Sequence, residues 1–150
     1  MKHASFVVTC LTLLLPLAAR AQQQQGSANK QVYNRADARP GVLSAAVRVG
    51  DMLYLSGVMG TKEGGGFADG GIEGQTRQAL ENVKANLALA GASMSDVAKC
   101  TVFLTDAANF QGMNKVYREF FPQDPPTRAT VGVTALAADY SVEIEVMAAR

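Results

Sequence analysis

Histidine and cysteine are scarce in this chain of 150 residues. His3 is the only histidine, and Cys10 and Cys100 are the only cysteines. His3 and Cys10 lie in an N-terminal segment that we expect to be removed, so the processed chain should keep no histidine and one thiol. This excludes a Ser-His-Asp triad, a Cys-His dyad, a histidine-ligated metal and an intramolecular disulfide. Any chemistry must rest on arginine, carboxylates, hydroxyls and backbone groups.

The N-terminus has the pattern of a secretory signal peptide. A basic start at Lys2 is followed by an apolar run over residues 6–17 and by Ala19-Arg20-Ala21, an A-x-A cleavage site. Pro16 interrupts the apolar run well before the roughly 20 residues that a membrane span needs. We therefore predict a signal peptide over residues 1–21 and an exported protein, periplasmic or secreted, that has no membrane contact once the signal is cleaved.

Removal of the signal leaves 150 − 21 = 129 residues, which is enough for one domain. Basic residues then number 14 − 2 = 12 against 13 acidic ones, a net charge of −1, and this balance does not indicate a nucleic-acid partner. The polar start of the processed chain, rich in glutamine, cannot build a core. We expect a flexible tether over residues 22–38 and a folded domain over residues 39–150.

The spacing of apolar residues predicts an α+β domain. Two helices are expected: one from Ile72 to Ala90 that stops at Gly91, and one capped by Asn109 that ends before Pro122. The loop before the first helix is rich in glycine but fits no phosphate-binding motif. The expected strands are residues 45–49, 52–59, 97–105, 127–136 and 140–148. The order β-β-α-β-α-β-β predicts one sheet with both helices on a single face, leaving the other face to solvent or other subunits.

Chemistry-bearing residues occur in the last two predicted strands. Arg128 shares a face with Thr130, and Glu143 alternates with apolar residues in the next strand. A simple hairpin between these strands would place Arg128 opposite Glu143. An ordinary ion pair on a solvated sheet face is the commoner outcome of such a pattern. The functional alternative is a bidentate arginine clamp for a substrate carboxylate, with Glu143 holding a water. Cys100 lies in an apolar run, which favours an inert buried thiol over a nucleophile.

Several stretches of the chain resemble the RidA/YjgF family of reactive intermediate deaminases. The closing motifs are PPTRATVGV, from Pro125, and VEIEVMAAR, from Val142. Four others fall in the family's order and spacing: MLYLSGVMG, QTRQALENVKANLALAG, KCTVFLTD and MNKVYREFFP. The similarity runs from about Gly41 to Arg150, nearly the whole predicted domain.

The resemblance implies a homotrimer of chorismate-mutase-like α+β subunits with clefts at the subunit interfaces. It implies hydrolysis of 2-imino or enamine acids, such as 2-iminobutanoate and 2-iminopropanoate, to 2-keto acids and ammonia, with no metal and no organic cofactor. It makes Arg128 the carboxylate-binding residue and Glu143 the water-positioning acid. The residues implied to contact substrate are Asn114, Ser56 and Gly57, together with Leu43, where the family has tyrosine, and Thr130, where it has cysteine.

Two other roles agree with the same sequence. A non-catalytic trimer that binds small carboxylates would keep Arg128 but would not use Glu143. A holdase that binds unfolded clients would depend on exposed apolar surface instead of the cleft.

Overall fold

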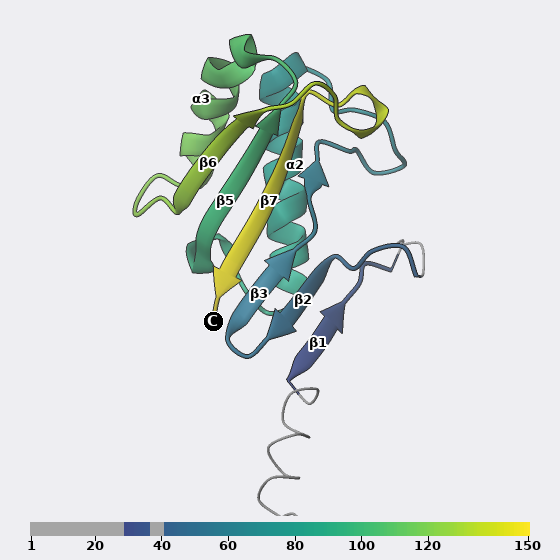
Figure 1. Cartoon of the computed structure of the whole chain (residues 1–150), viewed down its shortest axis with the longest axis vertical. Coiled ribbons are helices and arrows are strands. Elements are labelled where there is room, and N and C mark those ends of the chain that lie inside the picture. Colours follow the sequence, from purple (N-terminus) through teal and green to yellow (C-terminus); the bar gives the residue numbers. More distant parts are fainter. Residues whose placement is uncertain (1–28, 37–40) are drawn as a thin grey trace, which may run out of the picture.

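The computed structural model describes residues 29–36 and 41–150. Within them, a single mixed sheet carries two long helices on one of its faces (Figure 1). The predicted signal peptide and cleavage site lie outside the described residues. No helix in the described part of the chain is both long and apolar enough to cross a membrane.

The sheet has the strand order β1-β2-β3-β7-β5-β6, and the short strand β4 pairs with β7. Strands β5 and β6 run parallel, whereas the other pairs are antiparallel. The strands are β1 (Lys30–Tyr33), β2 (Ala46–Val49), β3 (Met52–Leu55), β4 (Val58–Met59), β5 (Val97–Leu104), β6 (Thr127–Gly132) and β7 (Val142–Ala149). The helices are α2 (Gly71–Leu89) and α3 (Phe110–Phe120), with 3-10 turns at Met94–Asp96, Ala107–Asn109 and Ala137–Asp139.

Helix α2 is the central element of the core and confirms the first predicted helix. It begins after Gly70, whose φ of 91° suits glycine, and ends before Gly91, whose φ is 70°. The apolar side chains that it buries against the sheet are Ala79, Leu80, Val83 and Leu87. Asn82 adds polar ties, since its amide donates to the carbonyls of Met59 at 3.1 Å and Thr61 at 3.0 Å.

Helix α3 confirms the second predicted helix, but its predicted cap is wrong. Asn109 has helical backbone angles and its side chain makes no capping bond. The chain enters α3 through the 3-10 turn at 107–109, and there the Asp106 carboxylate accepts from the Ala108 amide at 2.8 Å. Asp106 therefore does the capping work that the sequence assigned to Asn109.

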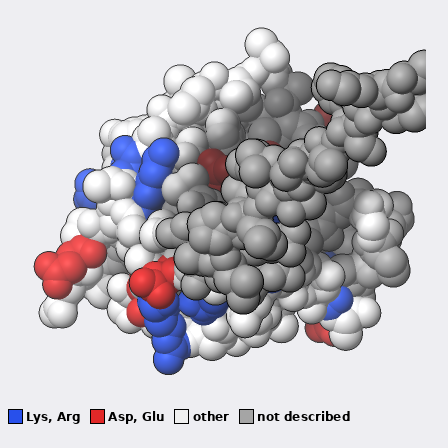
Figure 2. Space-filling view, turned by 60° about the horizontal axis from the view of Figure 1, so that its bottom comes forward, with Lys and Arg blue, Asp and Glu red and all other residues white. Residues whose placement is uncertain are grey.

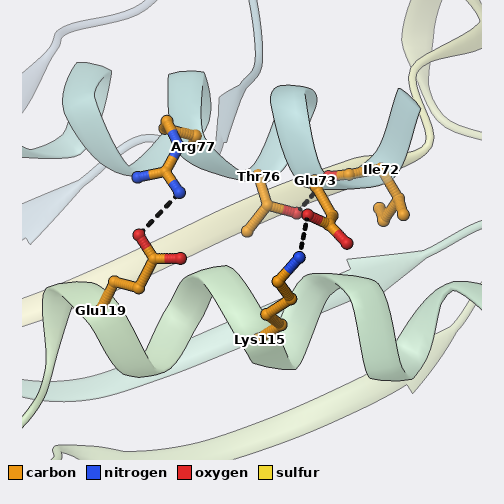
Figure 3. Close-up of polar contacts among 6 residues, drawn as sticks. All are labelled: Ile72, Glu73, Thr76, Arg77, Lys115 and Glu119. Carbon is orange, nitrogen blue, oxygen red and sulfur yellow. Dashed lines mark hydrogen bonds and ion pairs between the residues drawn. The ribbon is translucent and has the colours of Figure 1, made fainter. Parts of the chain in front are cut away.

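Two ion pairs join the helices across their solvent side (Figure 3). Arg77 of α2 contacts Glu119 at 2.6 Å, and Lys115 of α3 contacts Glu73 at 2.7 Å. These side chains are about half exposed, so each pair contributes on the order of 0.5 kcal/mol to folding. The packing between α2 and α3 rests mainly on their buried apolar residues.

Two expectations about the strands need correction. Residues 30–33, placed within the tether by the sequence, form strand β1 against β2. The last two strands do not form a hairpin, because β5 lies between β6 and β7 and pairs with both. The parallel pairing of β5 with β6 could not be predicted, because it leaves no local pattern in the sequence of either strand.

The sheet face away from the helices is partly apolar. Val47, Tyr54 and Met147 lie in one row across β2, β3 and β7, and Phe103 and Val131 lie in another across β5 and β6. Tyr54 is 42% exposed and Val131 is 41% exposed. This surface, named here the open sheet face, is uncovered in a single copy of the chain.

Candidate functional site

The predicted site residues fall into two groups on opposite faces of the sheet. The arginine half comprises Arg128 and Thr130 of β6 and Asn114 of α3. The glutamate half comprises Glu143 of β7, Ser56 and Gly57 between β3 and β4, and Leu43.

Arg128 lies on the helix-facing side of the sheet. Its partner in the ladder is Cys100, which is fully buried beneath the helices. The guanidinium carbon lies 4.5 Å from the ring centre of Tyr117 and 5.9 Å from that of Phe110, both on α3. Among the described residues, no carboxylate pairs with Arg128 and none of its N–H groups has a hydrogen-bond partner. The cation is held by aromatic faces, and its donors remain available to an anion.

Asn114 belongs to the same cluster by its place on the helix. Phe110, Asn114 and Tyr117 follow one another at helical spacings of four and three residues, so they share one face of α3. Arg128 contacts the rings at both ends of this row. Asn114 is partly exposed, and it lies between these rings on the same face of the helix.

Thr130 adjoins a cavity of about 520 Å³. It follows Arg128 by two residues on β6 and faces the same way. The cavity is lined by Leu104, Ala107, Ala108, Phe110, Gln111, Thr130 and Gly132. Because Phe110 contributes both to this wall and to the aromatic support of Arg128, a small acid bound by the arginine would find apolar surface next to it.

The glutamate half forms where β3 breaks into β4. Met59 of β4 is the partner of Glu143, and a Cβ added to Gly57 would collide with the Glu143 carboxylate. Glycine therefore lets that carboxylate lie directly against the backbone of residue 57. The Ser56 hydroxyl donates to the Ser44 carbonyl at 2.7 Å, which ties this break to the segment that follows Leu43. Leu43 itself is 60% exposed.

The two halves do not meet within one copy of the chain, and the predicted pairing of Arg128 with Glu143 is wrong. Arg128 pairs with Cys100 on the helix side, whereas Glu143 pairs with Phe103 on the open sheet face. One strand lies between them and their registers differ by three residues, which separates them by roughly 10 Å across the sheet and about 10 Å along it. No small acid can bridge that distance through the sheet.

Burial keeps the two titratable groups beneath Arg128, Cys100 and Tyr117, in their neutral forms. It raises the pKa of the Cys100 thiol, which supports the inert role predicted for it. Burial likewise raises the pKa of Tyr117, whose hydroxyl lacks a hydrogen-bond partner that satisfies normal geometry. Both groups stay neutral at physiological pH, leaving Arg128 as the charge of this cluster.

Two residues that support Arg128 were not predicted from the sequence. Phe110 and Tyr117 are not among the predicted site residues, yet both contact Arg128. Their helical spacing from Asn114, which was already predicted to belong to the site, could have indicated that they share its face of the helix. Among the described residues, no cluster of three His, Cys, Asp or Glu side chains could hold a metal.

The chain is similar to known proteins over nearly all of the described fold. The family model described as Endoribonuclease L-PSP matches residues 35–150. The 2-iminobutanoate/2-iminopropanoate deaminase of Dermatophagoides farinae is 41% identical over 109 residues, covering 70% of this chain and 83% of that protein. Reactive Intermediate Deaminase A of Arabidopsis thaliana is 36% identical over 136 residues, covering 89% of this chain and 73% of that protein.

A solved structure agrees with these sequence matches. Escherichia coli TdcF with bound serine superposes with a TM-score of 0.74 at 36% identity, covering 80% of this chain and 98% of that one. The fold is thus the α+β fold expected from the sequence. The extent of the family match and the identity to its members together show that this chain belongs to the Endoribonuclease L-PSP family, in which the RidA-type reactive intermediate deaminases are found.

Proposed function

We propose that this protein hydrolyses small 2-imino or enamine acids to 2-keto acids and ammonia. The observation that carries the proposal is the Arg128 guanidinium, which is half-buried, stacked on aromatic rings and without an anionic partner among the described residues. An arginine in this state is suited to bidentate binding of a carboxylate. The deaminase names of the relatives support the reaction class. The serine bound to TdcF shows that a similar protein accepts an amino acid.

The proposed reaction needs one bound substrate and one water. Arg128 and the backbone near Thr130 bind the substrate carboxylate and direct C2 toward a water held by Glu143. Glu143 takes a proton as the water oxygen attacks C2 of the protonated imine, which gives a neutral carbinolamine. Glu143 passes that proton to the nitrogen, the C–N bond breaks as the carbinolamine hydroxyl gives its proton back to Glu143, and ammonia and the keto acid result. Because imines are already electrophilic, orientation and charge stabilisation supply most of the required acceleration.

A complete site of this kind requires a second copy of the chain. Arg128 and Glu143 lie on opposite sheet faces, so the glutamate half must come from a neighbouring subunit. The open sheet face offers apolar side chains for that contact, including the exposed Tyr54 and Val131. We propose a homotrimer with three clefts, each joining the arginine half of one subunit to the glutamate half of the next.

The substrates are expected to have apolar side chains. The cavity beside Thr130 is lined mainly by apolar groups. Leu43, in the glutamate half, presents an aliphatic side chain where the family has a tyrosine hydroxyl and ring. A site with these walls favours imino acids with aliphatic side chains over polar ones. We further propose that the protein acts outside the cytoplasm, as its N-terminal sequence predicts.

Endoribonuclease activity, which the description of the family model names, has less support in this chain. RNA binding calls for a basic tract that neutralises several phosphates. Figure 2 shows acidic and basic side chains of the described residues intermixed on one face instead of gathered by sign. The arginine half offers one guanidinium, which suits a single small carboxylate.

The direct test is release of keto acid and ammonia from imino acids generated by an amino-acid oxidase. We expect Arg128→Ala to lose activity by about 10²-fold or more and Arg128→Lys to recover little of it, because lysine cannot form the bidentate contact. Retained activity in Arg128→Ala would show that Arg128 does not bind the substrate carboxylate. Carboxylate binding that needs Arg128, with no turnover by the wild type, would favour the non-catalytic binder. Suppression of client aggregation that is independent of Arg128 and Glu143 would favour the holdase.

A further inference from the structure

The Tyr117 ring lies directly beneath the guanidinium of Arg128. At 4.5 Å from the ring centre, the guanidinium carbon is at the distance of a close cation–π contact. Tyr117 is only 4% exposed and packs against Phe121, with ring centres 4.7 Å apart. The ring therefore cannot turn away without disturbing the core, so it offers Arg128 a fixed surface.

Stacking and hydrogen bonding use different directions of a guanidinium. Its face meets an aromatic ring, whereas its five N–H groups point outward in the plane. A guanidinium that lies flat on the Tyr117 ring has its plane fixed by the contact and keeps its N–H edge available. Phe110 lies farther away, at 5.9 Å, and adds a second, weaker contact. Since no described carboxylate orients Arg128, the aromatic contacts are its identified source of orientation.

The Tyr117 hydroxyl makes no hydrogen bond that would explain why a tyrosine stands at this position. It is buried and lacks a satisfactory hydrogen-bond partner, a state that normally opposes folding. The ring is thus the part of Tyr117 that acts on Arg128. This separates the effect of the ring from that of the hydroxyl and makes Tyr117→Phe a conservative control.

We propose that Tyr117 is a positioning residue for substrate binding, whose ring holds the Arg128 guanidinium in the plane that presents its N–H edge to a carboxylate. The proposal rests on the proposed function only in naming the carboxylate as the ligand. The close contact between Arg128 and Tyr117 belongs to the described structure, and its role can be tested whether or not the protein is a deaminase. Tyr117 does not touch substrate and takes no part in proton transfer.

The test compares three variants of the full mature protein: Tyr117→Phe, Tyr117→Leu and Val116→Ala. Val116, the preceding residue of α3, is fully buried and is the matched control for lost core packing. Binding of 2-oxobutanoate is measured by calorimetry, and KM and kcat by keto-acid release. We expect Tyr117→Leu to weaken binding by about 5- to 10-fold and to raise KM more than it lowers kcat. Tyr117→Phe and Val116→Ala should bind within about twofold of the wild type.

A second measurement separates this proposal from the proposed function. The side-chain N–H signal of Arg128 is followed by NMR, where the aromatic ring shifts the resonance and restricts its motion. We expect the shifted, ordered signal in the wild type and in Tyr117→Phe, and an unshifted, mobile one in Tyr117→Leu. If 2-oxobutanoate does not bind the wild type while these signals behave as expected, the proposed function fails and the positioning role stands. An Arg128 signal unchanged in folded Tyr117→Leu would overturn the proposal.

Discussion

Gly57→Ala is expected to remove activity while leaving the fold intact. A Cβ at residue 57 would collide with the Glu143 carboxylate, which is the far end of a flexible side chain. The side chain can rotate away at small cost, and alanine also restricts the unfolded chain, an effect worth about 0.4–1 kcal/mol in favour of folding. The two effects nearly cancel, so the free energy of unfolding should change by less than about 1 kcal/mol.

The displaced carboxylate no longer holds the attacking water. Loss of such a preorganised group typically lowers kcat by about 10²-fold, which corresponds to about 2.7 kcal/mol of barrier height. The assay is keto-acid release at saturating imino acid, run beside chemical denaturation. Adding Glu143→Gln to Gly57→Ala should cause little further loss, because both changes remove the same group.

Gly60→Ala is the matched control for the added methyl group. A Cβ at residue 60 would meet backbone atoms of Gln75 in α2, and these cannot rotate away. This variant should lose about 1–3 kcal/mol of stability, with its remaining folded fraction active. Wild-type activity in Gly57→Ala would refute the role of the Gly57–Glu143 contact. Unfolding of Gly57→Ala would contradict the structural part of the reasoning.

Three further predictions concern stability, pH and substrate preference. Asn82→Ala should lower the free energy of unfolding by about 1–3 kcal/mol in urea titrations, because two part-buried hydrogen bonds are lost. Arg77→Ala should change it by less than about 1 kcal/mol. Cys100 has a raised pKa in the folded state, so unfolding releases its proton and stability should fall above about pH 8.5, by up to about 1.4 kcal/mol per pH unit. Cys100→Ala should flatten that slope in denaturation curves between about pH 8.5 and 10, and an unchanged slope would contradict the assignment. Leu43→Tyr should raise kcat/KM for small polar imino acids relative to aliphatic ones, measured by competition between the two.

Periodicity was sufficient to predict the elements that build the core. The stripe of α2 and the alternation of Val142, Ile144 and Val146 follow from burial of one face, which a sequence displays directly. Strand β1 was missed because its residues are largely exposed and therefore carry no apolar alternation. The cap at Asp106 was missed because a 3-10 turn separates it from the helix proper.

The candidate site could be predicted by residue but not by arrangement. Arg128 and Glu143 were identified, yet their placement depends on which strand lies between β6 and β7, a long-range property of the sheet. The insertion of β5 separates the two strands, and the three-residue offset in register places the two residues on opposite faces, so the proposed site needs a second subunit. The contact between Arg128 and Tyr117 joins strand β6 to helix α3, so the residue spacing within either element could not predict it.

Complementation between two inactive variants tests most directly whether the active site is shared between subunits. Arg128→Ala and Glu143→Ala are each expected to be inactive in the imino-acid assay. When the two are unfolded together and refolded as an equal mixture, each cleft draws its two halves from different copies at random. About one quarter of the clefts then contain both Arg128 and Glu143, so about one quarter of wild-type activity should return. No recovery in correctly assembled mixtures, or full activity in either parent, would contradict the account.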